Sequence, residues 1–303
     1  MRAGLRTIGT ISLGAGVAAS IRAIANRRVR LRGLRTDQRH RIDRPPAPGA
    51  ARLSVVIPAY SEAGRIAGTI AALRAALAPI DRDGGVEIVV VDDGSTDGTS
   101  DAARAGGADQ VVPLRPNRGK GAAVRAGMLA THGRTVVFTD ADLSYAPEQI
   151  LRLLAEVEGG WDVVVGSRKH IETNVLVRGR CLRELSGRAF NLLTFGVLLG
   201  QYRDTQCGLK AFRSDVAQLL FSNARIDGFA FDVEIFHLIE RYRLSLLEVP
   251  VQLVNSKTST VRVGVEGVRM LRDLFRVRRW GSEGVYDLKE ESGAVPPLRS
   301  SAR

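Results

Sequence analysis

Short, predominantly apolar runs recur along the chain and are the feature that most limits its fold. They are LSVVIPA (53–59), VEIVVVDD (86–93), ADQVVPL (108–114), RTVVFTD (134–140) and WDVVVGSR (161–168). A continuous apolar run is typical of a strand that is covered on both faces. The segments between the runs have apolar residues at helical spacing, as at Ile66, Ile70, Leu73 and Leu77. This alternation predicts an α/β fold with a mostly parallel, doubly wound sheet and helices on both faces.

The pattern changes after residue 168. The spacing there predicts, in order, a helix over 182–199, a turn and short strand over 204–215, a largely apolar helix over 228–242 and a strand over 245–253. A basic amphipathic helix follows over 265–280, with Val265, Val268, Leu271, Phe275 and Val277 toward one side. We therefore expect one domain over 53–280, with a Pro-rich linker over 36–52 before it and a disordered tail over 281–303 after it.

The positive charge of the chain is concentrated at its ends. Residues 1–52 contain twelve arginines, no lysine and two aspartates, so they carry +10 of the net charge of +12. Residues 262–280 add six arginines against two acids. Because the body of the chain is close to neutral, this distribution favours attraction to an anionic membrane surface over a nucleic-acid groove. We therefore expect no nucleic-acid partner.

The first 35 residues predict a membrane-associating segment at the cytoplasmic face. Residues 7–21 are uncharged but shorter than the roughly 20 apolar residues that span a bilayer. The basic run at 27–35 would stay on the cytoplasmic side. A marginal anchor, a helix lying on the surface and a disordered leader all remain open, whereas the charge after the apolar run argues against a cleaved signal peptide. Two cysteines, Cys181 and Cys207, make no disulfide framework and fit a reducing compartment.

Two carboxylates follow the fourth apolar run. Asp140 ends the run, and Asp142 comes two positions later, before the loop LSYAPEQI. Both side chains can reach one cation as the chain turns, and Mg²⁺ typically takes one or two carboxylates together with substrate phosphates. An isolated DxD is also common in turns and helix caps. Its place at the end of a buried strand favours a site for Mg²⁺ or Mn²⁺ that neutralises a diphosphate.

Other polar residues are predicted to gather at the same edge of the sheet. Ligands of doubly wound sheets bind at the carboxyl ends of the strands. Tyr60 and Glu62 follow the first run, Asp93 ends the second and Arg168 ends the fifth. Asp93 could accept a hydrogen bond from a nucleobase or ribose, although a capped turn explains VVDDGSTDGT equally well. The absence from the sequence of GxGxxG, a Walker loop and zinc-type His/Cys spacing argues against a dehydrogenase, a P-loop NTPase and a zinc site.

Eight motifs together carry a resemblance to a known family. They are VVIPAYSE (55–62), VVDDGSTDGT (90–99), NRGKGAAVRAG (117–127), TDADLS (139–144), VGSR (165–168), DTQCGLKAF (204–212), FAFDVEI (229–235) and LEVPV (247–251). Their order and spacing resemble the family 2 glycosyltransferases with the GT-A fold. The last three resemble the polyprenyl-phosphate sugar synthases, in particular the dolichyl-phosphate β-glucosyltransferase group. The resemblance covers residues 53–280.

The resemblance implies a role for individual residues. The nucleoside diphosphate sugar would be held by Pro58, Tyr60, Glu62, Asp93, Lys120 and Asp140. The Mg²⁺ or Mn²⁺ ion would be held by Asp140 and Asp142, with Ser144 standing where relatives often have Gln. The phosphate of the lipid acceptor would be received by Arg168, Arg183 and Ser186, with Asp232 and Glu234 orienting the arginines. The catalytic group would be Asp142, Arg168 and Asp204, with Asp204 as the nominal base.

The implied reaction is transfer of a sugar, with inversion, from a nucleoside diphosphate to a polyprenyl phosphate. UDP-glucose is the favoured donor; GDP-mannose as donor, or a non-lipid glycan or small-molecule acceptor, is the alternative. A sugar-nucleotide pyrophosphorylase would be expected to carry a Gly-rich basic loop where this chain has PAYSE. A non-catalytic binding protein would have no need of both Asp140 and Asp142. The sequence makes no prediction of oligomeric state.

Overall fold

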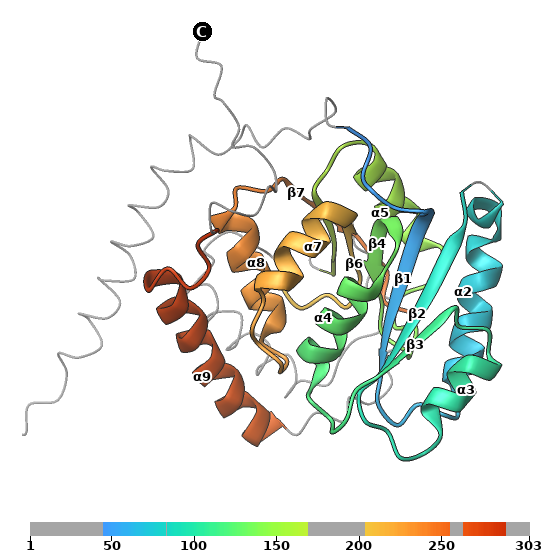
Figure 1. Ribbon diagram of the computed structural model, residues 1–303, viewed down its shortest axis with the longest axis horizontal. Coiled ribbons are helices and arrows are strands. Elements are labelled where there is room, and N and C mark those ends of the chain that lie inside the picture. The colour runs from blue at the N-terminus through green and yellow to red at the C-terminus, as the bar shows by residue number, and fades with distance from the viewer. Residues whose placement is uncertain (1–44, 83, 169–203, 255–262, 289–303) are drawn as a thin grey trace, which may run out of the picture. The chain divides into compact units, whose positions relative to one another are not determined.

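The computed structural model describes residues 45–82, 84–168, 204–254 and 263–288 (Figure 1). The predicted membrane-associating segment and the predicted helix over 182–199 lie outside the described residues, as does Cys181. Two of the predicted acceptor-phosphate residues, Arg183 and Ser186, also lie outside them.

The described residues form a seven-stranded sheet in the order β3-β2-β1-β4-β6-β5-β7. Its strands are β1 (Ala51–Ala59), β2 (Val86–Asp92), β3 (Gln110–Pro113), β4 (Gly133–Phe138), β5 (Val163–Ser167), β6 (Lys210–Arg213) and β7 (Leu246–Pro250). All neighbouring pairs are parallel except the two that involve β6. The prediction of an α/β fold with a mostly parallel sheet is therefore confirmed.

Helices cover both faces of the sheet, as the continuous apolar runs predicted (Figure 1). One face packs against α2 (Ile66–Asp81), α3 (Thr99–Ala105) and α5 (Gln149–Glu158). The other packs against α4 (Lys120–Ala130), α7 (Ser214–Asn223), α8 (Phe231–Arg241) and α9 (Val263–Ser282). Alternation along β1 illustrates the two cores, because Val55 and Ile57 pack on the first face and Val56 on the second.

Strand β6 is inserted antiparallel between β4 and β5. Its amino end therefore lies at the same edge of the sheet as the carboxyl ends of its two neighbours. Phe138, at the end of β4, pairs with Lys210, at the start of β6. This reversal brings the turn at 204–209 to the edge where the predicted site residues end their strands.

Helix α9 packs against the domain with Leu271 and Val277 of the predicted stripe, but not with Val268 and Phe275. Leu274 and Val277 are fully buried, while Val268 and Phe275 are 69% and 59% exposed. The prediction that Val268 and Phe275 lie on the same side as the packed residues is wrong, because α9 buries its 270/274/277 side against the domain core. Val268 and Phe275 therefore form an apolar ridge of α9 that is exposed to solvent.

The folded part extends beyond residue 280, where the predicted tail begins. Helix α9 continues to Ser282, and Tyr286 is fully buried. The Tyr286 hydroxyl donates to Glu234 Oε1 at 2.6 Å, and the Tyr286 carbonyl accepts from the Tyr242 hydroxyl. Pattern alone did not reveal this segment, because the buried Tyr286 and an ion pair between Asp287 and Arg241 hold it in place of a periodic apolar pattern.

The end of the predicted linker is also tied to the domain. The carbonyl of Pro45 accepts from Arg213 Nη2, and the carbonyl of Pro48 accepts from Ser214 Oγ, both at 2.6 Å. Residues 45–48 therefore lie against the start of α7, and β1 begins at Ala51. Within the described part of the chain, no helix has both the length and the apolar character needed to cross a bilayer.

Candidate active site

The loop after β4 carries the two predicted metal ligands. Asp140 is packed against the turn that precedes β6, so closely that a Cβ added at Gly208 would lie 2.1 Å from Asp140 Oδ2. Asp142 Oδ1 accepts from the backbone N–H of Ser144 at 2.9 Å and from its hydroxyl at 2.7 Å. Ser144 thus orients Asp142 through an Asx-type turn.

Lys120, the first residue of α4, pairs with Asp140. Its Nζ donates to Asp140 Oδ1 at 2.7 Å, and both side chains are partly exposed. Burial acts to lower the pKa of Lys120, but the charges of Asp140, Asp232 and Asp142 outweigh it and raise the pKa. The ammonium is therefore charged at neutral pH and lies among three carboxylates.

The donor side of the edge is lined by the loop after β1. Glu62 lies close enough to Asp142 that burial and this neighbouring carboxylate raise its pKa, against the opposing effect of Arg65. Tyr60 is 55% exposed, which leaves its ring free to stack on a flat ligand, and Pro58 lies in β1 opposite Val91 of β2.

The carboxylate of Asp93, at the end of β2, accepts hydrogen bonds from two backbone N–H groups. Its Oδ1 accepts from Arg118 N–H and its Oδ2 from Gly119 N–H, both at 2.8 Å. Burial raises its pKa, partly opposed by these two donors. Gly119 has a φ of +105°, and a Cβ there would lie 2.6 Å from the Asp227 carbonyl oxygen. Asp93 therefore fixes the start of α4, and with it Lys120, in addition to any bond that it makes to a ligand.

Arg168 and Asp204 form a two-pronged ion pair at the end of β5. Arg168 Nε donates to Asp204 Oδ2 at 2.7 Å, and Nη2 donates to Oδ1 at 2.8 Å. The Arg168 side chain is 39% exposed, whereas that of Asp204 is 2% exposed. Burial acts to lower the pKa of Arg168, but Asp204 outweighs it and raises the pKa. Asp204 therefore presents Arg168 to the solvent edge, a geometry that does not suit the predicted role of general base.

The two acids of α8 lie in different surroundings. Asp232 Oδ1 pairs with Lys210 Nζ at 2.7 Å, and Lys210 is 1% exposed. Glu234 accepts from the backbone N–H groups of Arg225 and Ile226 and from the Tyr286 hydroxyl. Glu234 therefore holds the loop between α7 and α8, and its described partners do not include the arginine that it was expected to orient.

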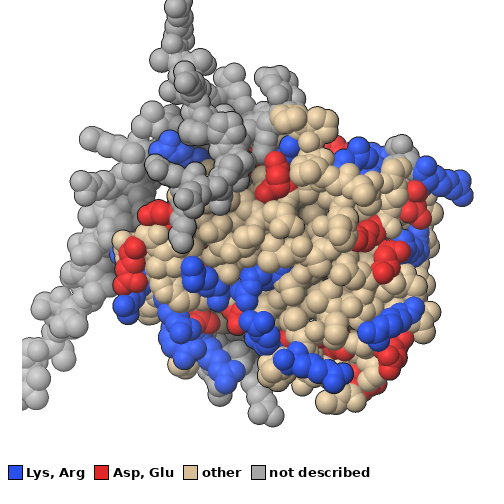
Figure 2. All heavy atoms as spheres, in the orientation of Figure 1, with Lys and Arg blue, Asp and Glu red and all other residues tan. Residues whose placement is uncertain are grey.

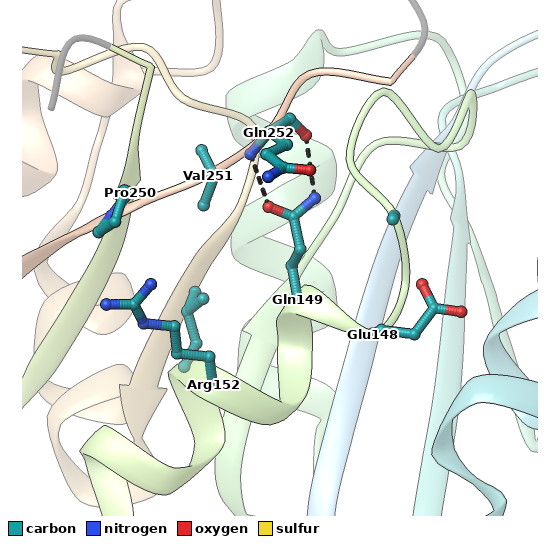
Figure 3. Close-up of a pocket in the computed structure, with 8 residues that line it drawn as sticks. Glu148, Gln149, Arg152, Pro250, Val251 and Gln252 are labelled. Atoms are coloured by element: carbon teal, nitrogen blue, oxygen red, sulfur yellow. Dashed lines mark hydrogen bonds between the residues drawn. The ribbon is translucent and has the colours of Figure 1, made fainter. Parts of the chain in front are cut away.

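The segment after β7 fastens the loop that carries Asp140 and Asp142. Val254 N–H donates to the Ser144 carbonyl at 2.9 Å, and Tyr145 bridges to Leu253. Figure 3 shows the second fastening, in which the Gln149 amide faces the Gln252 backbone and makes two hydrogen bonds of 2.7 and 2.9 Å. These contacts hold both ends of the turn that follows Asp142.

A surface pocket of about 390 Å³ lies beside this fastening, between α5 and the segment after β7 (Figure 3). Arg152, Leu153, Pro250 and Val251 contribute to its lining, and none of its lining residues is a predicted site residue. The candidate active site is thus the edge that carries Asp140 and Arg168, and the pocket is separate from the contacts described there.

The donor set of this edge fits a divalent cation that is shared with a substrate. In the described ranges no group of three or more His, Cys, Asp or Glu side chains could hold a metal ion alone. Asp140 and Asp142 offer carboxylate oxygens from one short loop, and Mg²⁺ or Mn²⁺ held by two carboxylates completes its shell with phosphate oxygens and water. Asp140 and Asp142 would therefore hold the ion, with Ser144 supporting Asp142.

Comparison with known proteins agrees with this geometry. The family description "Glycosyl transferase family 2" matches residues 54–221, which run from within β1 to beyond β6 and include the loop with Asp140 and Asp142. The chain belongs to glycosyl transferase family 2. This confirms the family resemblance carried by the eight motifs.

Within family 2, the chain is similar to proteins named dolichyl-phosphate beta-glucosyltransferase. The Drosophila melanogaster protein is 34% identical over 242 residues, which are 74% of each chain. The Saccharomyces cerevisiae protein is 31% identical over 257 residues, or 77% of this chain and 76% of its own. Both matches cover about three quarters of each chain, so the subgroup resemblance is also confirmed.

Solved structures show that this family 2 chain shares its fold with two phosphoglycerate-linked sugar synthases. Glucosyl-3-phosphoglycerate synthase from Mycobacterium tuberculosis, in complex with Mn²⁺, UDP and glucosyl-3-phosphoglycerate, has a TM-score of 0.56 and 24% identity over 76% of this chain and 80% of its own. Mannosyl-3-phosphoglycerate synthase from Rubrobacter xylanophilus has a TM-score of 0.58 and 23% identity, covering 81% and 79%. At this level of identity the likeness concerns the fold.

Two features of the family 2 site were missed by sequence reasoning. The first is Lys210, which pairs with Asp232 and was predicted only as part of a short strand. Its place beside the apolar residues Ala211 and Phe212 was a signal of a buried charge. The contact between Gly208 and Asp140 has no signal in the sequence, because it depends on how β6 is threaded into the sheet.

Proposed function

We propose that this family 2 glycosyltransferase moves glucose from UDP-glucose to a polyprenyl phosphate of the dolichyl type, with inversion at the anomeric carbon. The observation that carries the proposal is the meeting, at one sheet edge, of the Asp140–Asp142 loop and the partly exposed Arg168 guanidinium. The first suits a diphosphate with its cation, and the second suits a phosphate monoester. The names of the relatives, dolichyl-phosphate beta-glucosyltransferase, support the same donor sugar and acceptor.

The proposed reaction needs positioning more than proton removal. A phosphate monoester oxygen is largely ionised at neutral pH, because its second pKa is about 6, so it attacks without a strong general base. Two anions must approach each other, and the protein must offset their repulsion. Arg168, held flat by both oxygens of Asp204, would bind the acceptor phosphate in a bidentate manner. We therefore assign Asp204 as the residue that positions Arg168.

The residues that would bind the sugar donor lie at the same edge of the sheet, on the loops after β1 and β4 and at the start of α4. Tyr60 is exposed for stacking on the base, and Glu62 lies beside Asp142. A divalent cation held by Asp140 and Asp142 would supply the charge that stabilises the diphosphate leaving group. Lys120, already among the carboxylates of the site, is placed to approach the same diphosphate.

A transfer assay tests this function. Membranes containing the protein receive labelled UDP-glucose or GDP-mannose, polyprenyl phosphate and Mg²⁺, and the organic phase is counted. We expect label from UDP-glucose in the lipid fraction, and at least a hundredfold less with Asp142→Ala, since loss of the metal ligand removes stabilisation of the leaving group. Label from GDP-mannose alone would contradict the donor. Label on a soluble acceptor such as 3-phosphoglycerate, with none in lipid, would contradict the acceptor.

Helix α9 is proposed to rest on the cytoplasmic face of the membrane that holds the acceptor. Val268 and Phe275 are seven residues apart and share one exposed ridge with Arg272 and Arg279. Figure 2 shows basic side chains over α9 at the lower left of the face in view. An exposed apolar ridge flanked by arginines fits the boundary of anionic headgroups and acyl chains.

Loss of the apolar ridge is expected to weaken membrane association. In a chain lacking residues 1–35, the double change Val268→Asp and Phe275→Asp should lower binding to vesicles containing phosphatidylserine about tenfold or more, since each buried side chain contributes about 1.5–3 kcal/mol. Co-sedimentation measures the bound fraction, and Leu129→Ser, a partly exposed apolar residue of α4, is the matched control. Equal binding of the double variant and the parent would exclude α9 as the contact.

A further inference from the structure

Lys120 lies where the divalent cation and the nucleoside diphosphate are proposed to bind next to each other. Its Nζ lies 2.7 Å from Asp140 Oδ1, on the carboxylate that is proposed to hold the cation. The start of α4 cannot easily shift, because Asp93 binds the N–H groups of Arg118 and Gly119. A fixed backbone therefore holds the Lys120 ammonium beside Asp140.

The Asp140 carboxylate lies between Lys120 and the turn before β6. Its Oδ2 faces Gly208, where even a single added carbon atom would lie 2.1 Å away. The carboxylate is therefore packed between the lysine on one side and the turn before β6 on the other. A cation bound to Asp140 would stand close to the ammonium, and two like charges at such a distance repel each other.

Lys120 also lies near Asp232, but its hydrogen bond is made to Asp140. The neighbouring acid, Asp232, has its own counter-ion in the buried Lys210, at 2.7 Å. The Lys120 side chain is 26% exposed, so its ammonium can leave Asp140 for an anion that arrives at the edge. A diphosphate is such an anion, and its oxygens attract the lysine and the cation alike.

We propose that Lys120 makes the divalent cation and the nucleoside diphosphate bind cooperatively. This inference rests on the proposed function, which assigns Asp140 to the cation. Without the diphosphate, the ammonium weakens binding of the cation at Asp140. With it, Lys120 moves to a phosphate oxygen and the repulsion is removed. Because coupling between two ligands is reciprocal, the cation strengthens binding of the diphosphate by the same factor.

Binding of Mn²⁺ alone tests the proposal without any turnover. Isothermal titration of the full-length protein in detergent measures the Mn²⁺ affinity with and without saturating UDP. For the unmodified protein we expect UDP to strengthen Mn²⁺ binding about tenfold or more. Lys120→Met keeps the length of the side chain and removes its charge. It should bind Mn²⁺ alone about five- to tenfold more tightly and bind UDP alone more weakly, and the coupling should fall by about the same five- to tenfold factor, leaving the part that comes from direct coordination of phosphate by the ion.

Further variants test the role of the Lys120 charge and the assignment of Asp140 separately. Lys120→Arg keeps the charge and should retain the weak binding of Mn²⁺ alone. If Lys120→Met does not fold, Lys120→Gln takes its place. Unchanged or weaker Mn²⁺ binding by this variant would overturn the role of Lys120. Equal Mn²⁺ affinity with and without UDP in the unmodified protein would overturn it as well. Asp140→Asn tests the underlying assignment separately, because undiminished Mn²⁺ binding by that variant would show that the ion is held elsewhere.

Discussion

Replacing Gly208 with alanine is expected to lower the rate of sugar transfer at least a hundredfold while the protein stays folded. The added Cβ would lie 2.1 Å from Asp140 Oδ2 and 2.9 Å from its Cγ, far inside contact distance. Either Asp140 or the turn before β6 must move by about 1 Å to relieve this overlap. A misplacement of that size in a positioned group can lower a rate about a hundredfold. The overlap involves only the end of the partly exposed Asp140 side chain, which can rotate, so the free energy of unfolding should change little.

The rate and the stability are measured on the same preparations, by lipid extraction of labelled product and by thermal unfolding. Gly68→Ala is the matched control, because Gly68 lies in α2 with nothing within 4 Å of an added Cβ. That variant should keep full activity and gain up to about 1 kcal/mol from helix propensity. A Gly208→Ala protein that transfers glucose at the unmodified rate would mean that the position of Asp140 does not limit the reaction.

Replacing Glu234 with alanine is expected to have the largest effect on stability, about 3–5 kcal/mol. Glu234 is fully buried and accepts from the N–H groups of Arg225 and Ile226, at 2.9 and 2.8 Å, and from the Tyr286 hydroxyl at 2.6 Å. Its removal leaves these buried donors without an acceptor, and each unsatisfied group costs about 1–3 kcal/mol. A domain typically has only about 5–15 kcal/mol in total, so the variant should be close to its folding limit.

Denaturant unfolding of Glu234→Ala and Tyr286→Phe gives a graded comparison. The tyrosine variant loses one hydrogen bond and retains the buried ring, so it should lose only about 1–2 kcal/mol. It also keeps the edge-on contact of Tyr286 with Trp280 at 6.3 Å. A loss below about 1 kcal/mol for Glu234→Ala would mean that the loop between α7 and α8 finds other acceptors when the carboxylate is gone.

The strands and most helices were predictable because their signals are local. The apolar runs gave β1, β2, β4 and β5 with bounds shifted by only a few residues, since a strand covered on both faces has no polar position to interrupt it. Likewise, Ile66, Ile70, Leu73 and Leu77 are all fully buried in α2. The convergence of polar residues on one edge follows from the parallel strand direction alone.

The partners of each site residue were not predictable, because they come from distant parts of the chain. That Asp93 ends a strand is visible in the sequence, but its two oxygens find N–H groups 25 and 26 residues away. Asp204 looks like a free acid in its motif, yet Arg168, 36 residues earlier, binds both of its oxygens. Glu234 resembles Asp232 two residues before it, but it faces Tyr286. A local pattern can place a carboxylate at an edge without indicating its counter-ion.

The ion pair between Arg168 and Asp204 also acts as a clasp within the chain. Two hydrogen bonds join the end of β5 to the turn before β6, across 36 positions of sequence. The pair itself therefore sets the distance between these two parts of the sheet edge, whatever the length of chain that connects them. A longer connection between fixed ends costs only about 0.6 kcal/mol for each doubling of its length. Relatives that keep the pair are therefore expected to keep the geometry of this edge even where the connection differs in length.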